Sequence, residues 1–229
     1  MTSTSFAANC GFFLSDPYTV TDKQTVPTRS SLQEQLASFV LWIDGVGGYL
    51  VCLSHRLTIG QANVDPPVDL ALLADVSRHH ATIQRDPEGY FLEAVRKVQM
   101  NGQKIDKALL RSSDRITLGN SCQLQFWQPV PVSTSARLDI VSGHRFAEPV
   151  QAVILMADTL VIGPSAQTHV QVPDMTQPLI LYRTKNGLAA RWPGEMQIAG
   201  KAYRERGPLE PGATLVTDQI TLALERVGK

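Results

Sequence analysis

Two short stretches, Leu57-Thr58-Ile59-Gly60-Gln61 and Ser77-Arg78-His79-His80-Ala81, decide how the rest of this 229-residue chain is interpreted. The first is an apolar segment typical of a β-strand, and it ends near Gly60, where the chain can turn sharply. The second places a hydroxyl, a guanidinium and two imidazoles in four consecutive residues, and it continues into the alternating Ala81-Thr82-Ile83-Gln84. We therefore expect two strands, each next to a polar loop.

The segments around these stretches are short, apolar and separated by turn residues. We expect strands at residues 39–43, 49–53, 56–59, 81–85, 90–92, 98–100, 103–105, 115–118 and 123–127. Glycine-rich or Asn-Gly turns separate several of them, and residues 63–75, which include Pro66 and Pro67, are expected to form a loop. Short strands that recur every 8 to 12 residues or so predict a β-sandwich.

Taken together, the two stretches resemble the signature of forkhead-associated (FHA) domains. In that family a strand ends in Ile-Gly-Arg, and Ser-Arg-x-His-Ala and an Asn-Gly turn follow. The resemblance implies a β-sandwich whose loops bind phosphothreonine peptides. It implies that Ser77 contacts the phosphate, that Arg78 occupies a position from which some members of the family reach it, and that His80 is a buried structural histidine. Phosphothreonine carries a charge of about −1.5 to −2 and three acceptor oxygens, so its pocket needs guanidinium, hydroxyl and amide donors.

The chain departs from the family pattern at the residue after Gly60. Gln61 stands where the family has a phosphate-binding arginine, and glutamine brings neither a charge nor a bidentate fork. Loss of a charge-assisted contact costs about 1.5–3 kcal/mol, so the resemblance implies a weakened phosphate site. A simpler interpretation also stays open here: Ser77 and His80 only brace their loop.

A second departure concerns the asparagine that grips the peptide backbone in the family. Asn101-Gly102 follows an alternating strand pattern and fits a later hairpin turn instead. The gripping asparagine is expected within 94–97, where the chain has Ala94-Val95-Arg96-Lys97. Arg96 and Lys97 add positive charge at this edge, although adjacent basic residues also occur in ordinary solvated loops. The candidate phosphopeptide ligands are Gln61, Ser77, Arg78, Arg96 and Lys97, and the candidate structural residues are Gly60, His80, Asn101 and Gly102.

The second half of the chain repeats the first. YLVCLSHRLTIG at residues 49–60 aligns without gaps on AVILMADTLVIG at residues 152–163, and further matches follow. A period of about 100 residues is the size of a domain and too long for a solenoid unit. We therefore expect an all-β chain with two FHA-like sandwiches in tandem. The expected divisions are a flexible arm at 1–38, a first sandwich at 39–128, a linker (stiff, then looser) at 129–135 and a second, divergent sandwich at 136–229.

The second repeat lacks the residues of a phosphate site. Pro164, which has no side-chain donor, follows Ile162-Gly163, and Met175-Thr176-Gln177-Pro178 stands where Ser-x-x-His is expected. We expect this repeat to pack against the first, to self-associate or to hold another partner.

The N-terminal arm carries two patterns. Ser31-Leu32-Gln33-Glu34 is a capping box, which predicts a short helix that must dock on the domain or fray. Thr19 precedes Asp22 by three residues, a spacing that some FHA domains recognise once the threonine is phosphorylated. The alternative is an ordinary threonine in a flexible tail.

Composition excludes several classes of function. Lys+Arg and Asp+Glu number 21 each and no basic block occurs, so a nucleic-acid partner is not expected. No apolar run reaches the roughly 18 residues of a membrane span, because Asp44 interrupts the longest one. The N-terminus lacks the basic region of a signal peptide, so a cytoplasmic location is expected. Cys10, Cys52 and Cys122 have no metal-ligand spacing, and the last two lie in apolar runs typical of buried thiols.

No pattern of a catalytic site is present in the sequence. His79 and His80 are adjacent, and adjacent residues on a strand point to opposite faces, so they do not form a chelating pair. The sequence has no nucleophile elbow, P-loop or dinucleotide fingerprint. We expect no enzyme activity, no metal and no cofactor.

Two functions remain open. The first is a recognition protein in signalling or assembly that binds a phosphothreonine-containing protein partner. The second is a structural or assembly protein that keeps the sandwich and binds its partner without phosphate, or forms a homo-oligomer. The departures at Gln61 and at residues 94–97 are the reason for keeping the second.

Overall fold

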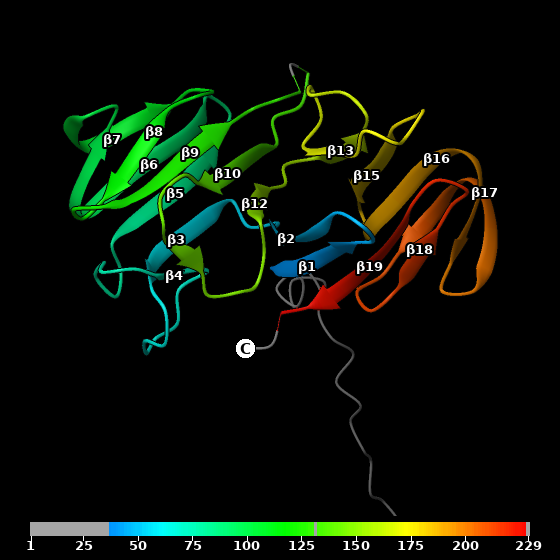
Figure 1. Cartoon of the computed structure of the whole chain (residues 1–229), viewed down its shortest axis with the longest axis horizontal. Helices are drawn as coiled ribbons and strands as arrows, with labels where there is room; N and C mark the ends of the chain where they lie inside the picture. Colours follow the sequence, from blue (N-terminus) through cyan, green and yellow to red (C-terminus); the bar gives the residue numbers. More distant parts are fainter. Residues whose placement is uncertain (1–36, 131, 228–229) are drawn as a thin grey trace, which may run out of the picture.

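The computed structural model describes residues 37–130 and 132–227. All helical or strand structure among these residues is β-structure, which confirms the all-β expectation (Figure 1). The arm at 1–36, including the predicted helix and Thr19, lies outside the described residues. Within the described part of the chain, no helix is long and apolar enough to span a membrane.

Nineteen strands form in the described residues, and they divide between the two halves of the chain. The first half forms β1 (Ser38–Ile43), β2 (Gly47–Cys52), β3 (Arg56–Gln61), β4 (Leu70–Leu73), β5 (Ala81–Asp86), β6 (Gly89–Met100), β7 (Gln103–Leu110), β8 (Arg115–Leu118) and β9 (Cys122–Trp127). The second half forms β10 (Ala136–Ile140), β11 (Arg145–Phe146), β12 (Ala152–Leu155), β13 (Thr159–Gly163), β14 (Val170–Gln171), β15 (Leu179–Thr184), β16 (Gly187–Ile198), β17 (Lys201–Leu209), β18 (Thr214–Val216) and β19 (Thr221–Arg226).

The long hairpin β6–β7 connects the two layers of the first sandwich. The start of β6 pairs with β5 and its end pairs with β8, and a register shift between Glu93 and Val98 lies between the two parts. A bulge of this kind bends a strand, so one strand can serve two sheets. The sequence predicted two separate strands, at 90–92 and 98–100, and this is wrong because β6 continues through the bulge.

The second half has the same plan. β13 pairs with β15, β15 with β16, β16 with β17 and β18, and β18 with β19. β16, like β6, has twelve residues and shifts register part-way, between Arg191 and Glu195. The turn at Ala199-Gly200 has φ values of 50° and 76°, close to the 51° and 84° of Asn101-Gly102. The sequence repeat is therefore also a structural repeat.

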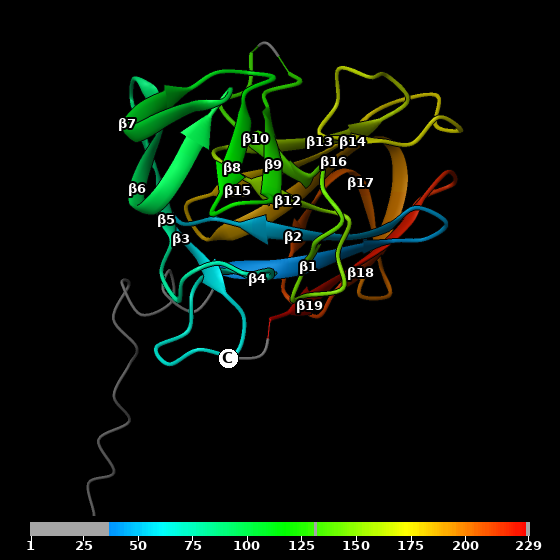
Figure 2. The ribbon, with the colours of Figure 1, turned by 60° about the vertical axis from the view of Figure 1, so that its left-hand side comes forward.

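The two halves exchange their first strands. β1 pairs with β19 of the second half, and β10 pairs with β9 of the first half. Figure 1 shows β1 beside β19 and β10 beside β9, and Figure 2 shows β2 running next to β12. β2 and β12 form a parallel pair, which joins the halves into one hydrogen-bonded sheet. The boundaries at 39–128 and 136–229 stay a prediction, and the exchange was not expected.

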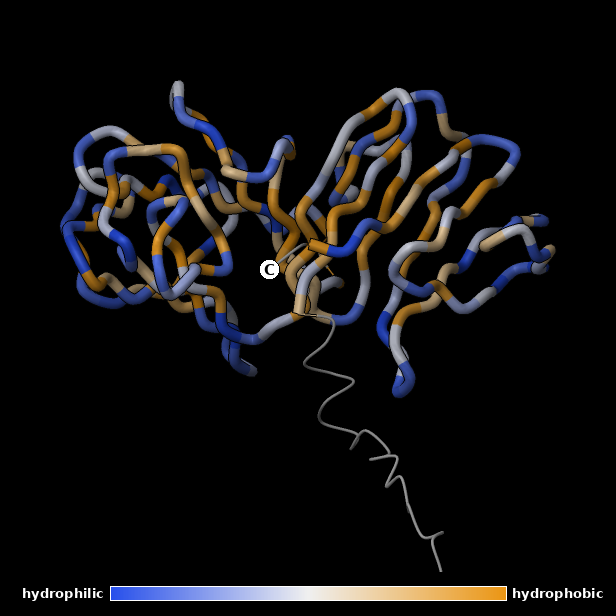
Figure 3. Tube along the Cα trace, turned by 90° about the horizontal axis from the view of Figure 1, so that it is seen from below, coloured by the Kyte–Doolittle hydropathy of each residue, from blue (hydrophilic) through white to orange (hydrophobic). Residues whose placement is uncertain are grey.

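Two hydrophobic cores lie on opposite faces of the β2–β12 pair. Tyr49 and Ile154 belong to the core of the second half, while Leu50 and Val153 belong to the core of the first. Both strands are therefore buried on both faces, as parallel strands usually are. In Figure 3 apolar residues concentrate along the strands, and hydrophilic residues concentrate at the turns.

Two further segments differ from expectation. The predicted loop at 63–75 contains β4, which pairs in parallel with β3. The alternating Leu70 and Leu72 are both fully buried, and this burial holds the segment as a strand. The predicted loose end of the linker is held in place: the Ser135 hydroxyl donates to the Thr159 carbonyl at 2.6 Å and accepts the Ala157 amide at 2.9 Å.

Candidate functional site

Gly60 brings the ends of the two deciding stretches into contact. A Cβ atom at this position would lie 1.8 Å from the Arg78 carbonyl oxygen, so the close approach requires glycine. The Gln61 amide donates to the Ser77 carbonyl at 3.1 Å, and the His80 amide donates to the Ile59 carbonyl at 2.8 Å. The end of β3 and the β4–β5 loop are therefore fixed against each other.

His80 is the buried centre of this arrangement, with 3% of its surface exposed. Its Nδ1 accepts the Ser77 amide at 3.0 Å, so the proton of a neutral ring is on Nε2. Nε2–H then donates to the Lys97 carbonyl at 2.9 Å, and the Gly119 amide donates to the same carbonyl at 3.0 Å. One imidazole thus ties the Ser77 loop to the bulge of β6.

The bulge forms the third side of the site. The amides of Val95 and Arg96 both donate to the His80 carbonyl at 3.0 Å, which places Arg96 and Lys97 beside the loop of Ser77. The Lys97 ammonium donates to Asn120 at 3.1 Å, and the Arg96 guanidinium donates to the neighbouring Val95 carbonyl at 3.1 Å.

The five candidate ligands all reach the surface. Ser77 is half-buried, and Gln61, Arg78, Arg96 and Lys97 are exposed. In the described part of the chain, no hydrogen bond or ion pair occupies the Arg78 guanidinium or the Ser77 hydroxyl. The side chains at this edge thus include the cationic and hydroxyl donors that an anion needs.

Asn101 and Gly102 lie in the two-residue turn between β6 and β7, and Met100 pairs with Gln103 across it. Positive φ at both turn residues suits the Asn-Gly sequence. The Asn101 side chain bonds outward to β8, donating to Asp114 at 2.8 Å and accepting the Arg115 amide at 2.9 Å. The hairpin interpretation is therefore confirmed.

Asp69 braces β3, a role that the sequence analysis missed. Its carboxylate accepts the Thr58 amide at 2.8 Å and the Thr58 hydroxyl at 2.7 Å. In the second half, His169 accepts the Val161 amide at 2.9 Å from the same place beside β13. In both halves the available signal was a polar residue directly before a buried aliphatic one, Leu70 or Val170.

The second half keeps the close approach in a looser form. A Cβ at Gly163 would meet Pro178 at 3.3 Å, and the nearby Thr168 hydroxyl donates to the Ser165 carbonyl at 2.7 Å. Pro164 brings no donor to this edge.

Cys52 and Cys122 are buried free thiols. Burial raises the pKa of Cys52 to about 12 and that of Cys122 to about 11, so both stay protonated at neutral pH. Among the described residues, no group of three or more His, Cys, Asp or Glu side chains could hold a metal ion.

Comparison with known proteins bears on this arrangement of loops. The family model of the FHA domain matches residues 57–119. The resemblance to the FHA family is therefore confirmed for this segment. It spans β3 to the end of β8 and contains every candidate ligand. No curated protein matches the chain.

Several solved structures resemble parts of the chain. The FHA-2 domain of an ABC transporter from Mycobacterium tuberculosis is 28% identical, covers 39% of this chain and 76% of its own, and has a TM-score of 0.31. The Slr1951 protein from Synechocystis sp. is 26% identical, covers 36% of this chain and 87% of its own, and has a TM-score of 0.27. An FHA domain studied for phosphothreonine-dependent interactions is 24% identical, covers 36% of this chain and 88% of its own, and has a TM-score of 0.23.

Proposed function

We propose that this protein is a non-catalytic recognition protein whose FHA segment binds a phosphothreonine-containing stretch of a partner protein. The proposed ligands are Gln61, Ser77, Arg78, Arg96 and Lys97. The observation that carries the proposal is the convergence of three chain segments around the buried His80, inside the segment that the FHA model matches.

The chemistry of the edge suits a phosphate. A phosphothreonine offers three acceptor oxygens, and the Ser77 hydroxyl and the Arg78 guanidinium are the donors with no competing protein acceptor in the described residues. Arg96 and Lys97 add charge on the opposite side, where their carbonyl and amide groups are already bound to the His80 loop. Gly60 and His80 hold the edge in shape, and Asn101 and Gly102 form a hairpin that does not touch the ligand.

Gln61 weakens the proposed site. An arginine at this position would supply a charged, bidentate contact, and its absence costs about 1.5–3 kcal/mol of binding. This corresponds to about one to two decades in affinity. The bulge supplies charge in place of an asparagine, so a bound peptide would be held mainly through its phosphate.

The test is fluorescence polarisation of the full chain with a library of phosphothreonine peptides and their dephosphorylated counterparts. We expect selective binding that falls at least tenfold in a Ser77→Ala, Arg78→Ala double variant. A matched control, Ser165→Ala with Arg204→Ala, removes the same two residue types from exposed positions of the second half and should leave binding unchanged. Binding that ignores dephosphorylation, or survives the first double variant, contradicts the proposal.

A phosphate-independent assembly role is the second candidate. The exchange of β1 and β10 between the halves favours it, because this exchange makes a single continuous scaffold from two sandwiches. Light scattering and pull-down with and without phosphatase distinguish the two. A homo-oligomer or a partner captured equally after phosphatase treatment supports this second function. Action in the cytoplasm, without nucleic acid, membrane or cofactor, stays a prediction.

A further inference from the structure

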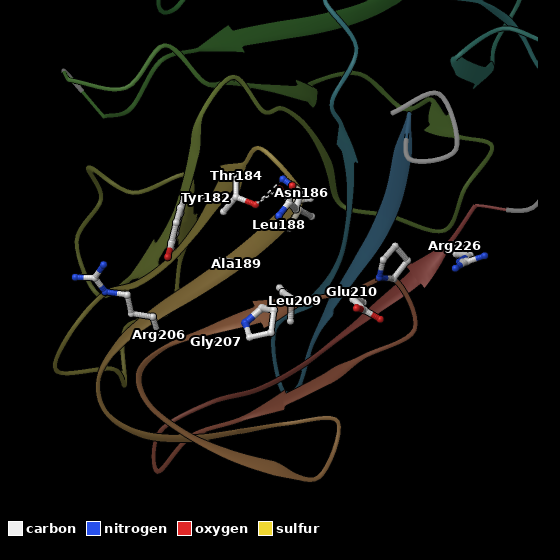
Figure 4. Close-up of a pocket in the computed structure, with 13 residues that line it drawn as sticks. Tyr182, Thr184, Asn186, Leu188, Ala189, Arg206, Gly207, Leu209, Glu210 and Arg226 are labelled. Carbon is white, nitrogen blue, oxygen red and sulfur yellow. Dashed lines mark hydrogen bonds between the residues drawn. The ribbon is translucent and has the colours of Figure 1, made fainter. Parts of the chain in front are cut away.

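The second half carries a hollow of about 720 Å³ on the outer face of β15, β16 and β17. Tyr182, Ala189 and Pro208 lie opposite one another across the three strands and form one row of its lining. In Figure 4, Tyr182 and Arg206 stand on one side, and Glu210 and Arg226 stand on the other. The hollow faces away from the core, since Leu188 and Ala190, the neighbours of Ala189, belong to the core and Ala189 does not.

The corresponding face of the first half has a smaller hollow, of about 350 Å³, and its central charges are paired. Phe91 occupies the middle strand there, opposite Gln84 and Leu109. Glu93 and Lys107 are opposite each other and form an ion pair of 2.6 Å. The Lys107 ammonium also lies 5.3 Å from the centre of the Phe91 ring. This face therefore pairs the charges of Glu93 and Lys107, and the Phe91 ring lies under the Lys107 ammonium.

The positions of Phe91, Glu93 and Lys107 carry different residues in the second half. The strand registers place Ala189 where the first half has Phe91, because each is two residues beyond the hairpin glycine, Gly187 or Gly89. Replacement of a phenylalanine by an alanine removes the ring that would occupy the space. Ala189 is only 7% exposed although it lies outside the core, so it forms the floor of the hollow.

The ion pair is replaced by two arginines. Arg191 stands at the position of Glu93 and Arg206 at that of Lys107, and the two are directly opposite in the β16–β17 pair. Like charges opposite each other on a sheet are destabilising, and neither arginine has an ion-pair partner among the described residues. Arg226 also lines the hollow, against a single acidic lining residue, Glu210. The second half thus lacks the aromatic ring and the carboxylate that the first half has at these positions, in Phe91 and Glu93.

We propose that this hollow binds an acidic segment of a partner protein. The segment places an aromatic side chain over Ala189 beside Tyr182, and its carboxylates pair with Arg191 and Arg206. A guanidinium binds a carboxylate through two parallel hydrogen bonds, and aromatic rings pack edge-to-face or offset against a tyrosine. The volume lies in the range of established binding pockets, about 300–1,000 Å³.

The segment lies on the face of the sheet and does not extend it. Among the described residues β17 pairs only with β16, so none of them pairs with its other edge, but Pro208 in this strand has no amide hydrogen to donate. Proline on an edge strand blocks the addition of another strand. Recognition therefore depends on side chains, in the hollow and on its arginine rim. The proposal does not rest on the phosphopeptide site, which is in the other half.

The probe is a set of fluorescein-labelled peptides that carry one phenylalanine and a glutamate two residues later, the spacing of Phe91 and Glu93. Binding to the full chain is measured by fluorescence anisotropy, against counterparts with Phe→Ala or Glu→Gln. We expect saturable binding that weakens at least tenfold in each counterpart. The variants Ala189→Phe, which refills the hollow, and Arg206→Gln, which removes one charge, should each weaken binding by the same order.

Matched controls come from the first half. Lys107→Gln removes the cation equivalent to Arg206, and the Ser77→Ala, Arg78→Ala double variant disables the proposed phosphate site, and both should leave this binding unchanged. The proposal is overturned if no peptide of the set binds saturably, or if Ala189→Phe leaves binding intact. It is also overturned if light scattering shows a dimer that Ala189→Phe dissociates, because a second copy would then be the occupant.

Discussion

Ala152 of β12 lies directly opposite Tyr49 of β2 in a parallel pair, although the two residues are 103 positions apart in the chain. Leu50 and Val153, the next residues along, are opposite each other as well. The same separation of 103 residues aligns the two repeats in sequence, so the repeats meet along equivalent strands, β2 and β12. Because the cores lie on opposite faces of this pair, each half depends on strands from the other.

This exchange predicts crossed effects of core mutations. Phe39 belongs to the first repeat but is fully buried in the core of the second half. Leu138 belongs to the second repeat but is fully buried in the core of the first half. Phe39→Ala should lower the free energy of unfolding by about 3–5 kcal/mol and Leu138→Ala by about 2–5 kcal/mol. In amide hydrogen exchange, Phe39→Ala should first deprotect β18 and β19, whereas Leu138→Ala should first deprotect β8 and β9.

Val132→Ala is the control for this pair, because Val132 is 97% exposed and its truncation creates no cavity. We expect a change within about 0.5 kcal/mol. If Phe39→Ala instead deprotects β3 and β5 of its own repeat and leaves β19 protected, the strands are not exchanged in solution.

Gly60→Ala should break the edge on which the proposed phosphate site depends. The added Cβ would lie 1.8 Å from the Arg78 carbonyl oxygen, and a backbone atom cannot move aside as a flexible side chain can. We expect a loss of about 3 kcal/mol or more in urea denaturation. Gly143→Ala, where no atom lies within 4 Å of the new Cβ, should be nearly neutral. Equal stabilities for the two variants would show that the loops do not approach this closely.

Most of the first sandwich could be predicted because its strands alternate and its turns carry glycine. β4 was missed, since four residues after two prolines give too short a pattern to separate from a loop. The exchange of β1 and β10 between the halves also has no signature in the sequence of these strands. β1 is a continuous apolar run and β10 is apolar at alternate positions, and neither pattern distinguishes one core from an equivalent one.

The site followed from the sequence to the extent that it consists of adjacent residues. Ser77 to His80 and Gly60-Gln61 were recognisable because the motif fixes their spacing. The hydrogen bonds from His80 to Lys97 and from Thr58 to Asp69 were not, since they join residues that only the folded chain brings together. The hollow over Ala189 became visible only by comparing registers between the halves, because alanine itself has no functional signature.

His169 predicts a loss of stability in acid. Its ring is fully buried, and burial lowers its pKa from 6.5 to about 4. Between these values the unfolded chain binds a proton that the folded chain does not, so stability is complete above about pH 6.5 and falls as the pH drops toward 4. The loss attributable to this residue is about 3 kcal/mol.

The measurement is urea denaturation at about pH 7.5 and about pH 4.5, compared with His169→Asn. Asparagine can accept the Val161 amide, as Asp69 accepts that of Thr58 in the first half, and it does not titrate. The variant should lose a smaller part of its stability in acid. An unchanged pH dependence would place the titrating group elsewhere.

Gln61→Arg should strengthen phosphopeptide binding at the first-half site. Gln61 is exposed, and its amide already fixes the backbone against Ser77, so the longer side chain needs no rearrangement of the loop. A restored guanidinium adds a charge-assisted contact to the phosphate, and we expect the dissociation constant to fall by about 10- to 100-fold. Gln197→Arg adds the same charge at an exposed position of β16 and should have no effect, which separates a specific contact from general attraction. Isothermal titration of both variants with a phosphothreonine peptide and its unphosphorylated form makes the comparison. Equal gains for the two variants, or a gain that persists without the phosphate, would mean that Gln61 does not face the phosphate.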